Sequence, residues 1–207
     1  MAPRTSPLLP GLNTPTYDVP DAELALHDGF FAPDKADELF VALQTSIPWK
    51  QEPIVLFGKE MMQPRLTAWV GDEGVSYTYS GITMNPHPWT PELLFIKKQI
   101  ETISQVPFNS VLLNFYRDGQ DSMGWHQDKE PELGKNPVIG SVSFCATRPF
   151  QLQHKRRKDV PRLDIPLSHG SFLLMQGPTQ HHWRHRIPKT QKPLGPRINL
   201  TFRNILF

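Results

Sequence analysis

The sequence contains a single cysteine, Cys145, among 207 residues. One cysteine cannot form a disulfide within the chain, so a packed core must hold the fold together, and this length is sufficient to build one. No apolar run approaches the roughly 18 residues of a membrane helix, and the first residues lack the apolar stretch of a secretory signal. These absences argue against a disulfide-rich secreted module and a helical membrane protein. We expect an intracellular protein, cytoplasmic in a bacterium or nuclear in a eukaryote.

Acidic residues are scarce towards the end of the chain. From Arg148 onward only Asp159 and Asp164 are acidic, whereas Lys and Arg are numerous and the net charge is +2. Such asymmetry favours an anionic partner on one face, although a solvated cationic surface explains the charge equally well. The densest run, Lys155–Lys158, falls between expected strands and could contact phosphates from an exposed loop.

Abundant proline, 22 residues, makes a long helical bundle improbable. One helix is predicted to begin at Pro33 and to end before Pro48. A second follows an N-cap at Thr90, has Pro91 in its first turn and ends before Pro107.

After Pro107 the pattern changes to short strands separated by turn residues, which predicts a β-sandwich or jelly roll. Residues 54–81, between the two helices, have the pattern of hairpins. The fold class is therefore α+β, with residues 1–20 as a flexible tail, 21–108 as a mixed N-terminal part and 109–207 as the β core. The expected strands of the core are Ser110–Tyr116, Val138–Phe144, Phe150–Gln153, Arg162–Pro166, Ser171–Met175, His182–Arg186 and Arg197–Arg203.

A metal-binding pattern lies in the string Gly124-Trp125-His126-Gln127-Asp128. On an extended strand, residues two apart point to the same face, so His126 and Asp128 could bind one ion from one side. A second histidine would complete the facial triad of an Fe(II) oxygenase, which leaves positions for a bidentate co-substrate and dioxygen. Alone, the triplet is a weak signal.

The last expected strand adds a second signal. Its alternation puts Arg197, Asn199, Thr201 and Arg203 on one face and the apolar residues on the other. Such a polar stripe commonly faces solvent, but two arginines on one face also form a clamp for a dicarboxylate. The strand from Ser110 to Tyr116 similarly puts Asn114 and Tyr116 on one face.

Together these motifs resemble the AlkB-type nucleic-acid dealkylases, over roughly residues 50–207. The resemblance rests on N-x-Y (Asn114, Tyr116), H-Q-D (His126–Asp128), H-W-x-H (His182–His185) and R-x-N-x-T-x-R (Arg197–Arg203). It implies a double-stranded β-helix with a hairpin nucleotide-recognition lid, and Fe(II), 2-oxoglutarate and O2 as cofactor and co-substrates. It implies His126, Asp128 and His185 as iron ligands, with His182 in a structural or supporting role. The implied 2-oxoglutarate residues are Asn114, Tyr116, Arg197, Asn199, Thr201 and Arg203.

The resemblance is to duplex-acting members in particular, and it implies roles for the hairpin segment. Phe57, followed by Gly58, would be the apolar finger that fills the gap left by a flipped base. Tyr79, near Tyr77, would stack on that base, and Glu130 would meet its polar edge. Lys129 stands where some duplex-acting relatives carry an acid, which leaves the base preference open.

The expected activity is oxidative demethylation of N1-methyladenine and N3-methylcytosine in DNA, releasing formaldehyde, succinate and CO2. The expected partner is alkylated DNA, single- or double-stranded, with RNA as a further candidate, no membrane, and a monomeric enzyme. Two alternatives stay open: an RNA demethylase or protein hydroxylase of the same superfamily, and a non-catalytic nucleic-acid-binding module.

Overall fold

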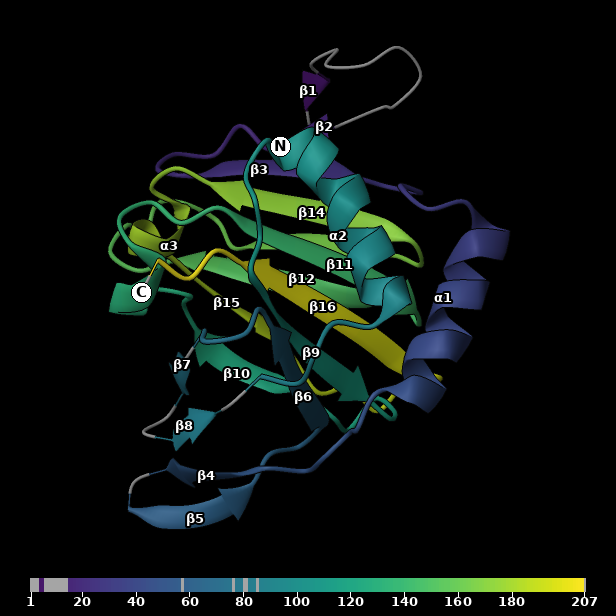
Figure 1. Ribbon diagram of the computed structural model, residues 1–207. Coiled ribbons are helices and arrows are strands. Elements are labelled where there is room, and N and C mark those ends of the chain that lie inside the picture. Colours follow the sequence, from purple (N-terminus) through teal and green to yellow (C-terminus); the bar gives the residue numbers. More distant parts are fainter. Residues whose placement is uncertain are drawn as a thin grey trace.

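Two antiparallel β-sheets form the centre of the protein in a computed structural model, which describes residues 4–5, 15–56, 58–75, 77–79, 82–84 and 86–206. The larger sheet has the strand order β1-β2-β3-β14-β11-β16-β9-β6 (Figure 1). Its strands are β1 (Arg4–Thr5), β2 (Pro15–Thr16), β3 (Glu23–His27), β14 (Ser171–Gln176), β11 (Ile139–Cys145), β16 (Arg197–Arg203), β9 (Ser110–Tyr116) and β6 (Leu66–Gly71).

The smaller sheet has the order β10-β15-β12-β13 and faces the larger one. Its strands are β10 (Met123–His126), β15 (Trp183–Ile187), β12 (Arg148–His154) and β13 (Leu163–Leu167). Two facing antiparallel sheets with crossover connections form the predicted jelly roll, which is confirmed. Two hairpins project from one end of it (Figure 1): β4 (Pro53–Leu56) with β5 (Lys59–Met62), and β7 (Tyr77–Tyr79) with β8 (Ile82–Met84).

Helices cover the outer face of the larger sheet (Figure 1). Both predicted helices are present, as α1 (Pro33–Ser46) and α2 (Pro91–Ser104), and the Thr90 hydroxyl caps α2 by accepting a hydrogen bond from the backbone N–H of Leu93. A 3-10 turn, η1 (Pro131–Leu133), and a short helix, α3 (Thr179–His182), complete the elements. Because α1 and α2 lie on the outer face, the space between the two sheets is filled by side chains of the strands.

The strand β16 lies in the middle of the larger sheet, and each of its seven residues is buried. Its apolar residues Ile198, Leu200 and Phe202 belong to the core under the helices. Its polar residues face the other way, into the space between the sheets, and not into solvent. Buried polar side chains need hydrogen-bond partners, so the space between the sheets is the candidate position of a binding site.

Several sequence predictions differ from the structure in detail. Asp128 lies beyond the end of β10, so it does not share a strand face with His126, and His182 ends α3 where a strand was expected. Within residues 54–81, β6 is a strand of the larger sheet and not part of a hairpin. The flexible tail at residues 1–20 and the division at residue 108 stay predictions, since much of the tail lies outside the described residues.

Candidate active site

The three predicted iron ligands converge between the sheets. The ligand atoms of His126, Asp128 and His185 lie within 4.8 Å of one another. His126 and His185 are cross-strand partners on β10 and β15, with ring centroids 4.2 Å apart. Asp128 reaches them from the segment after β10, where its backbone N–H donates to Gln180 Oε1 at 3.1 Å. The pairing of two strands and one loop contact thus produce the cluster.

Both imidazoles are in the state that a metal requires. The Nδ1 of His126 lies 2.8 Å from the carbonyl oxygen of Gly124, so Nδ1 carries the proton and Nε2 keeps its lone pair. Burial lowers the pKa of His126, and burial together with the neighbouring His126 ring lowers the pKa of His185 to about 3. Both rings are therefore neutral at pH 7.

The carboxylate of Asp128 is ionised despite its burial. Burial alone would raise the pKa of Asp128, but the Arg203 guanidinium and the two imidazoles hold it well below its usual range. Arg203 Nη2 donates to Asp128 Oδ1 at 2.6 Å, while Asp128 Oδ2 lies 3.8 Å from His185 Nε2. One carboxylate oxygen is thus held by Arg203 and the other faces the histidines, which orients the group towards a shared ion.

Arg197, at the other end of the polar stripe, is a buried cation with unused donors. Its Nη2 donates to Ser143 Oγ at 2.9 Å, and its guanidinium carbon lies 5.1 Å from the centroid of the Tyr116 ring. Its Nε and Nη1 are buried and have no hydrogen-bond partner among the described residues. Burial lowers the pKa of Arg197 to about 10, so it remains charged at neutral pH. A buried guanidinium with free donors is suited to an incoming carboxylate.

The cavity between Arg197 and the three ligands is lined by all the residues predicted for 2-oxoglutarate. Asn114 accepts from Arg65 Nε at 2.7 Å, and the Asn199 amide donates to Ser141 Oγ and the Val142 carbonyl. Thr201 Oγ1 lies 3.4 Å from Asn199 Oδ1. The structure therefore brings Asn114, Tyr116, Arg197, Asn199, Thr201 and Arg203 together around one cavity.

A family model for the 2OG-Fe(II) oxygenase superfamily matches residues 23–203. The chain belongs to this superfamily. Fe(II), 2-oxoglutarate and O2 are accordingly the cofactor and co-substrates of the fold, and two observations fit them to the residues present. Two neutral imidazoles and one carboxylate are a donor set that Fe(II) accepts. The free donors of buried Arg197 fit a carboxylate of 2-oxoglutarate.

Sequence relatives show that the chain is similar to AlkB-like oxygenases of the superfamily. The bovine alpha-ketoglutarate-dependent dioxygenase alkB homolog 3 is 45% identical over 192 residues, which span 89% of this chain and 66% of that protein. The human DNA oxidative demethylase ALKBH2 is 43% identical over 187 residues, 85% of this chain and 71% of that one. The solved structure of OsALKBH1, at 18% identity, has a TM-score of 0.64 over 91% of this chain and 98% of its own. That last likeness supports the fold alone.

The residues expected to read the base are only partly described. Phe57 lies outside the described residues, and Tyr77 and Tyr79 are placed on β7 by their backbone alone. Gly58 is exposed at the turn of the β4–β5 hairpin with φ of 75°, a left-handed conformation that glycine adopts without strain. Glu130, just before η1, has a buried Oε2 with no hydrogen-bond partner in the described part of the chain.

Sequence reasoning missed several residues that hold the site in place. Arg65 supports Asn114, and Gln180 holds the backbone of Asp128. Arg148 is fully buried beside Tyr116, and its guanidinium donates to the carbonyl oxygens of Asp118, Asp121 and Pro188. Arg148 precedes the expected strand Phe150–Gln153, and no local pattern indicates its burial, because its partners are backbone carbonyls of residues distant in sequence.

Proposed function

We propose that the chain is an Fe(II)- and 2-oxoglutarate-dependent oxygenase that removes N-linked methyl groups from nucleic-acid bases. The observation that carries the proposal is the pairing of the His126, Asp128 and His185 cluster with the free donors of Arg197 in one buried cavity. A protein that only binds nucleic acid needs neither feature. The similarity to a protein named DNA oxidative demethylase supports the same reaction.

In this proposal His126, Asp128 and His185 hold the iron. Arg197, with Tyr116 beside it, binds one carboxylate of 2-oxoglutarate, and Arg203 stands near the other end of the cavity while it orients Asp128. Asn114, Asn199 and Thr201 complete the polar lining. When bound, iron and 2-oxoglutarate supply the oxygen chemistry that hydroxylates an N-methyl group, which then leaves as formaldehyde.

The proposed substrates are N1-methyladenine and N3-methylcytosine in DNA. Methylation at these positions makes the base cationic, and the free buried Oε2 of Glu130 is an acceptor suited to such a base. Phe57, Tyr77 and Tyr79 stay predictions for base extrusion and stacking. None of the helices in the described ranges is long and apolar enough to cross a membrane.

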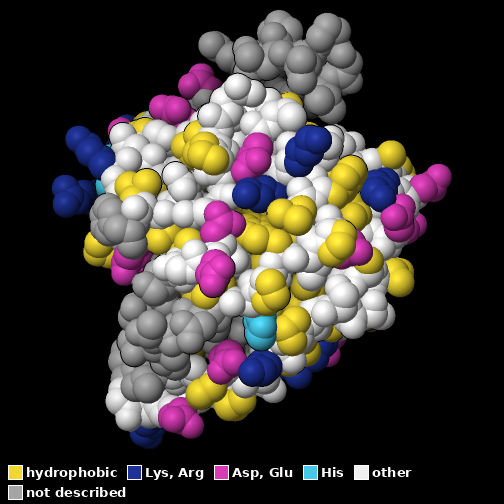
Figure 2. Space-filling model, viewed as in Figure 1, with side chains coloured by type: hydrophobic (Ala, Val, Ile, Leu, Met, Phe, Trp, Pro, Cys, Tyr) yellow, Lys and Arg dark blue, Asp and Glu magenta, His cyan; other side chains and the backbone are white. Residues whose placement is uncertain are grey.

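The distribution of charged side chains on the surface indicates where the phosphates of a nucleic acid could bind. On the face seen in Figure 2, acidic and basic side chains are intermixed among apolar ones over the described residues. The basic loop Lys155–Lys158, by contrast, follows β12 and is exposed, and of its four cations Arg157 pairs with Asp159. Phosphate contacts by this loop would add a salt-dependent increment to binding.

The test is a substrate panel. Purified protein with Fe(II) and 2-oxoglutarate should release formaldehyde from methylated oligonucleotides, and His185→Ala should abolish the release. Comparing double-stranded DNA, single-stranded DNA and RNA decides among the nucleic acids, and Glu130→Gln should raise the KM for the methylated strand. Release of formaldehyde from none of the three would refute the proposal and favour a protein substrate.

A further inference from the structure

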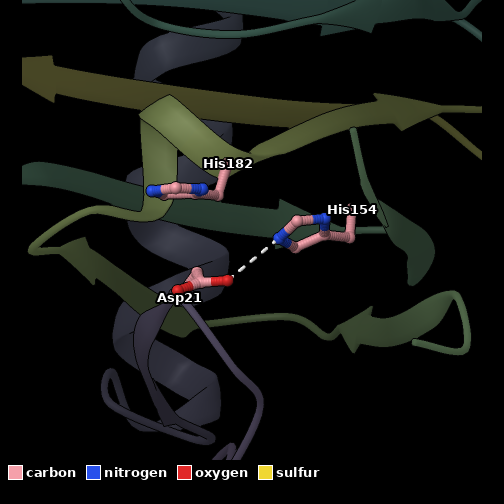
Figure 3. A group of neighbouring side chains, drawn as sticks. All are labelled: Asp21, His154 and His182. Carbon is pink, nitrogen blue, oxygen red and sulfur yellow. Dashed lines mark hydrogen bonds and ion pairs between the residues drawn. The ribbon is translucent and has the colours of Figure 1, made fainter. Parts of the chain in front are cut away.

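A second cluster of metal-ligand residue types lies outside the candidate iron site. Asp21, His154 and His182 come from the turn before β3, the end of β12 and the end of α3, and their ligand atoms lie within 4.8 Å of one another. Figure 3 shows the Asp21 carboxylate facing the ring of His154, with the ring of His182 above the carboxylate in this view. Two histidines and a carboxylate would suit Zn²⁺ by composition.

The proton positions argue against a metal here. His154 Nδ1 accepts the backbone N–H groups of Arg157 at 2.9 Å and Arg156 at 3.2 Å, so Nδ1 cannot carry a proton. The proton of the neutral ring is therefore on Nε2, which donates to Asp21 Oδ2 at 3.2 Å. A metal at Nε2 would push the proton onto Nδ1, against two N–H donors. His126 has the opposite arrangement, with Nδ1 facing a carbonyl oxygen.

His154 instead joins two separate segments. Through Nδ1 it fixes the backbone of Arg156 and Arg157, the centre of the basic loop. The first residue of the loop, Lys155, donates its backbone N–H to the carbonyl oxygen of His182 at 2.8 Å. The His154 side chain is only 2% exposed and packs edge-on against Trp183, at 5.3 Å between ring centroids. The loop thus begins from a buried and rigid base.

The Asp21 side of the cluster is held as firmly. Trp183 Nε1 donates to the carbonyl oxygen of Pro20 at 2.9 Å, directly before Asp21. Asp21 itself has φ of 58°, a left-handed conformation that Asp and Asn tolerate better than most residues. The Asp21 side chain is 41% exposed, whereas the His154 side chain is buried. The contact between them therefore joins a buried ring to a partly exposed carboxylate.

We propose that His154 is a positioning residue for nucleic-acid binding: as the Nε2–H tautomer, held by Asp21, it fixes the basic loop Lys155–Lys158 in the conformation that meets the phosphate backbone. The proposal rests on the proposed function, because it assumes a nucleic-acid substrate. A loop fixed in advance binds more tightly, since less conformational freedom is lost when its long side chains contact phosphates.

Three variants separate the atoms involved. His154→Phe keeps a ring against Trp183 but offers no acceptor to the loop. His154→Asn keeps an acceptor oxygen that can reach the same amides, as asparagine does in turns. Asp21→Asn keeps an acceptor for Nε2–H and tolerates the left-handed conformation, but it removes the charge that a metal would need.

Binding of an unmethylated single-stranded oligonucleotide by fluorescence anisotropy does not depend on turnover. His154→Phe should raise the Kd about fivefold, while His154→Asn and Asp21→Asn stay within about twofold of the parent. The KM for 2-oxoglutarate should not change in any of the three, because the cluster is outside the oxygenase site. Equal Kd values for the parent and His154→Phe, or a Kd raised as much by His154→Asn, would overturn the proposal.

Two NMR measurements on the unmodified protein need no nucleic acid, and a zinc titration of the parent and of Asp21→Asn adds a third test. Nitrogen NMR of the histidine rings should find His154 protonated at Nε2 alone, and the amides of Arg156 and Arg157 should exchange slowly with solvent. A proton on Nδ1 of His154 would refute the proposed positioning role. So would binding of a second equivalent of Zn²⁺ by the parent protein that is lost in Asp21→Asn. If no methylated strand is demethylated, the proposed function fails, while the tautomer and the amide exchange still decide this inference.

Discussion

Replacing Arg197 with methionine should make the protein more stable and, at the same time, unable to use 2-oxoglutarate well. Arg197 is 1% exposed and charged, and two of its guanidinium nitrogens lack a partner in the described structure. A buried donor without a partner costs about 1–3 kcal/mol. Methionine fills a similar volume, and it removes the penalty along with the hydrogen bond to Ser143 and the contact with the Tyr116 ring.

The two effects can be given magnitudes. The lost hydrogen bond and ring contact offset part of the relief, so the free energy of unfolding without co-substrate should rise by about 1 kcal/mol. For a chain of this length that corresponds to a rise in Tm of roughly 2–4 °C. Removing the partner of a buried carboxylate costs about 2–5 kcal/mol, so the Kd for 2-oxoglutarate should increase at least about 30-fold.

Thermal unfolding without 2-oxoglutarate and calorimetric titration with it measure the two effects. Arg148→Met is the matched control, because Arg148 is equally buried beside Tyr116 but its guanidinium is bound to three carbonyl oxygens. Its loss leaves those acceptors without a donor and should lower the Tm by several degrees. The reasoning is wrong if Arg197→Met lowers the Tm as Arg148→Met does, or if its affinity for 2-oxoglutarate is unchanged.

Three further changes have clear expected outcomes. Asp128→Asn should abolish Fe(II) binding, measured by metal titration, and should also destabilise the metal-free protein by about 3–5 kcal/mol, because it removes the carboxylate from its buried ion pair with Arg203. Thr90→Ala should cost about 1 kcal/mol in chemical denaturation by removing the cap of α2. Gly170→Ala should cost more, since φ there is 71° and the new Cβ would lie 2.5 Å from the Phe31 carbonyl oxygen; no loss of stability would contradict that geometry.

Local patterns predicted much of the fold. Ser110–Tyr116 and Arg197–Arg203 were predicted with the bounds that the structure has, because turn residues flank both runs and Arg197–Arg203 also alternates strictly between polar and apolar residues. The helices α1 and α2 were predicted from proline and an N-cap. β3 was not predicted, since its five residues contain only three apolar ones and its pairing with β14 comes from far along the chain.

The candidate site shows the same division between local and distant information. The sequence could propose His126 and Asp128 by their spacing, and the family pattern chose His185. The sequence could not show that Gln180 and Arg203 hold Asp128 in place, or that Arg197 is buried with free donors. These contacts form between segments that meet only in the folded protein. The burial of His154 and its tautomer are likewise set by neighbours distant in sequence.

The position of β3 in the larger sheet has a consequence for synthesis on the ribosome. β3 pairs with β14, and the contact of Glu23 with Thr179 joins residues 156 positions apart. At about 5–20 residues per second, the ribosome needs roughly 8–30 s to make the intervening chain. During that interval β3 has only β2 beside it, and the pair of β6 with β9 lacks its next neighbour β16, so the larger sheet stays in separate parts. Nascent chains of this protein should therefore depend on chaperones until β16 has emerged and the sheet can close around the cavity.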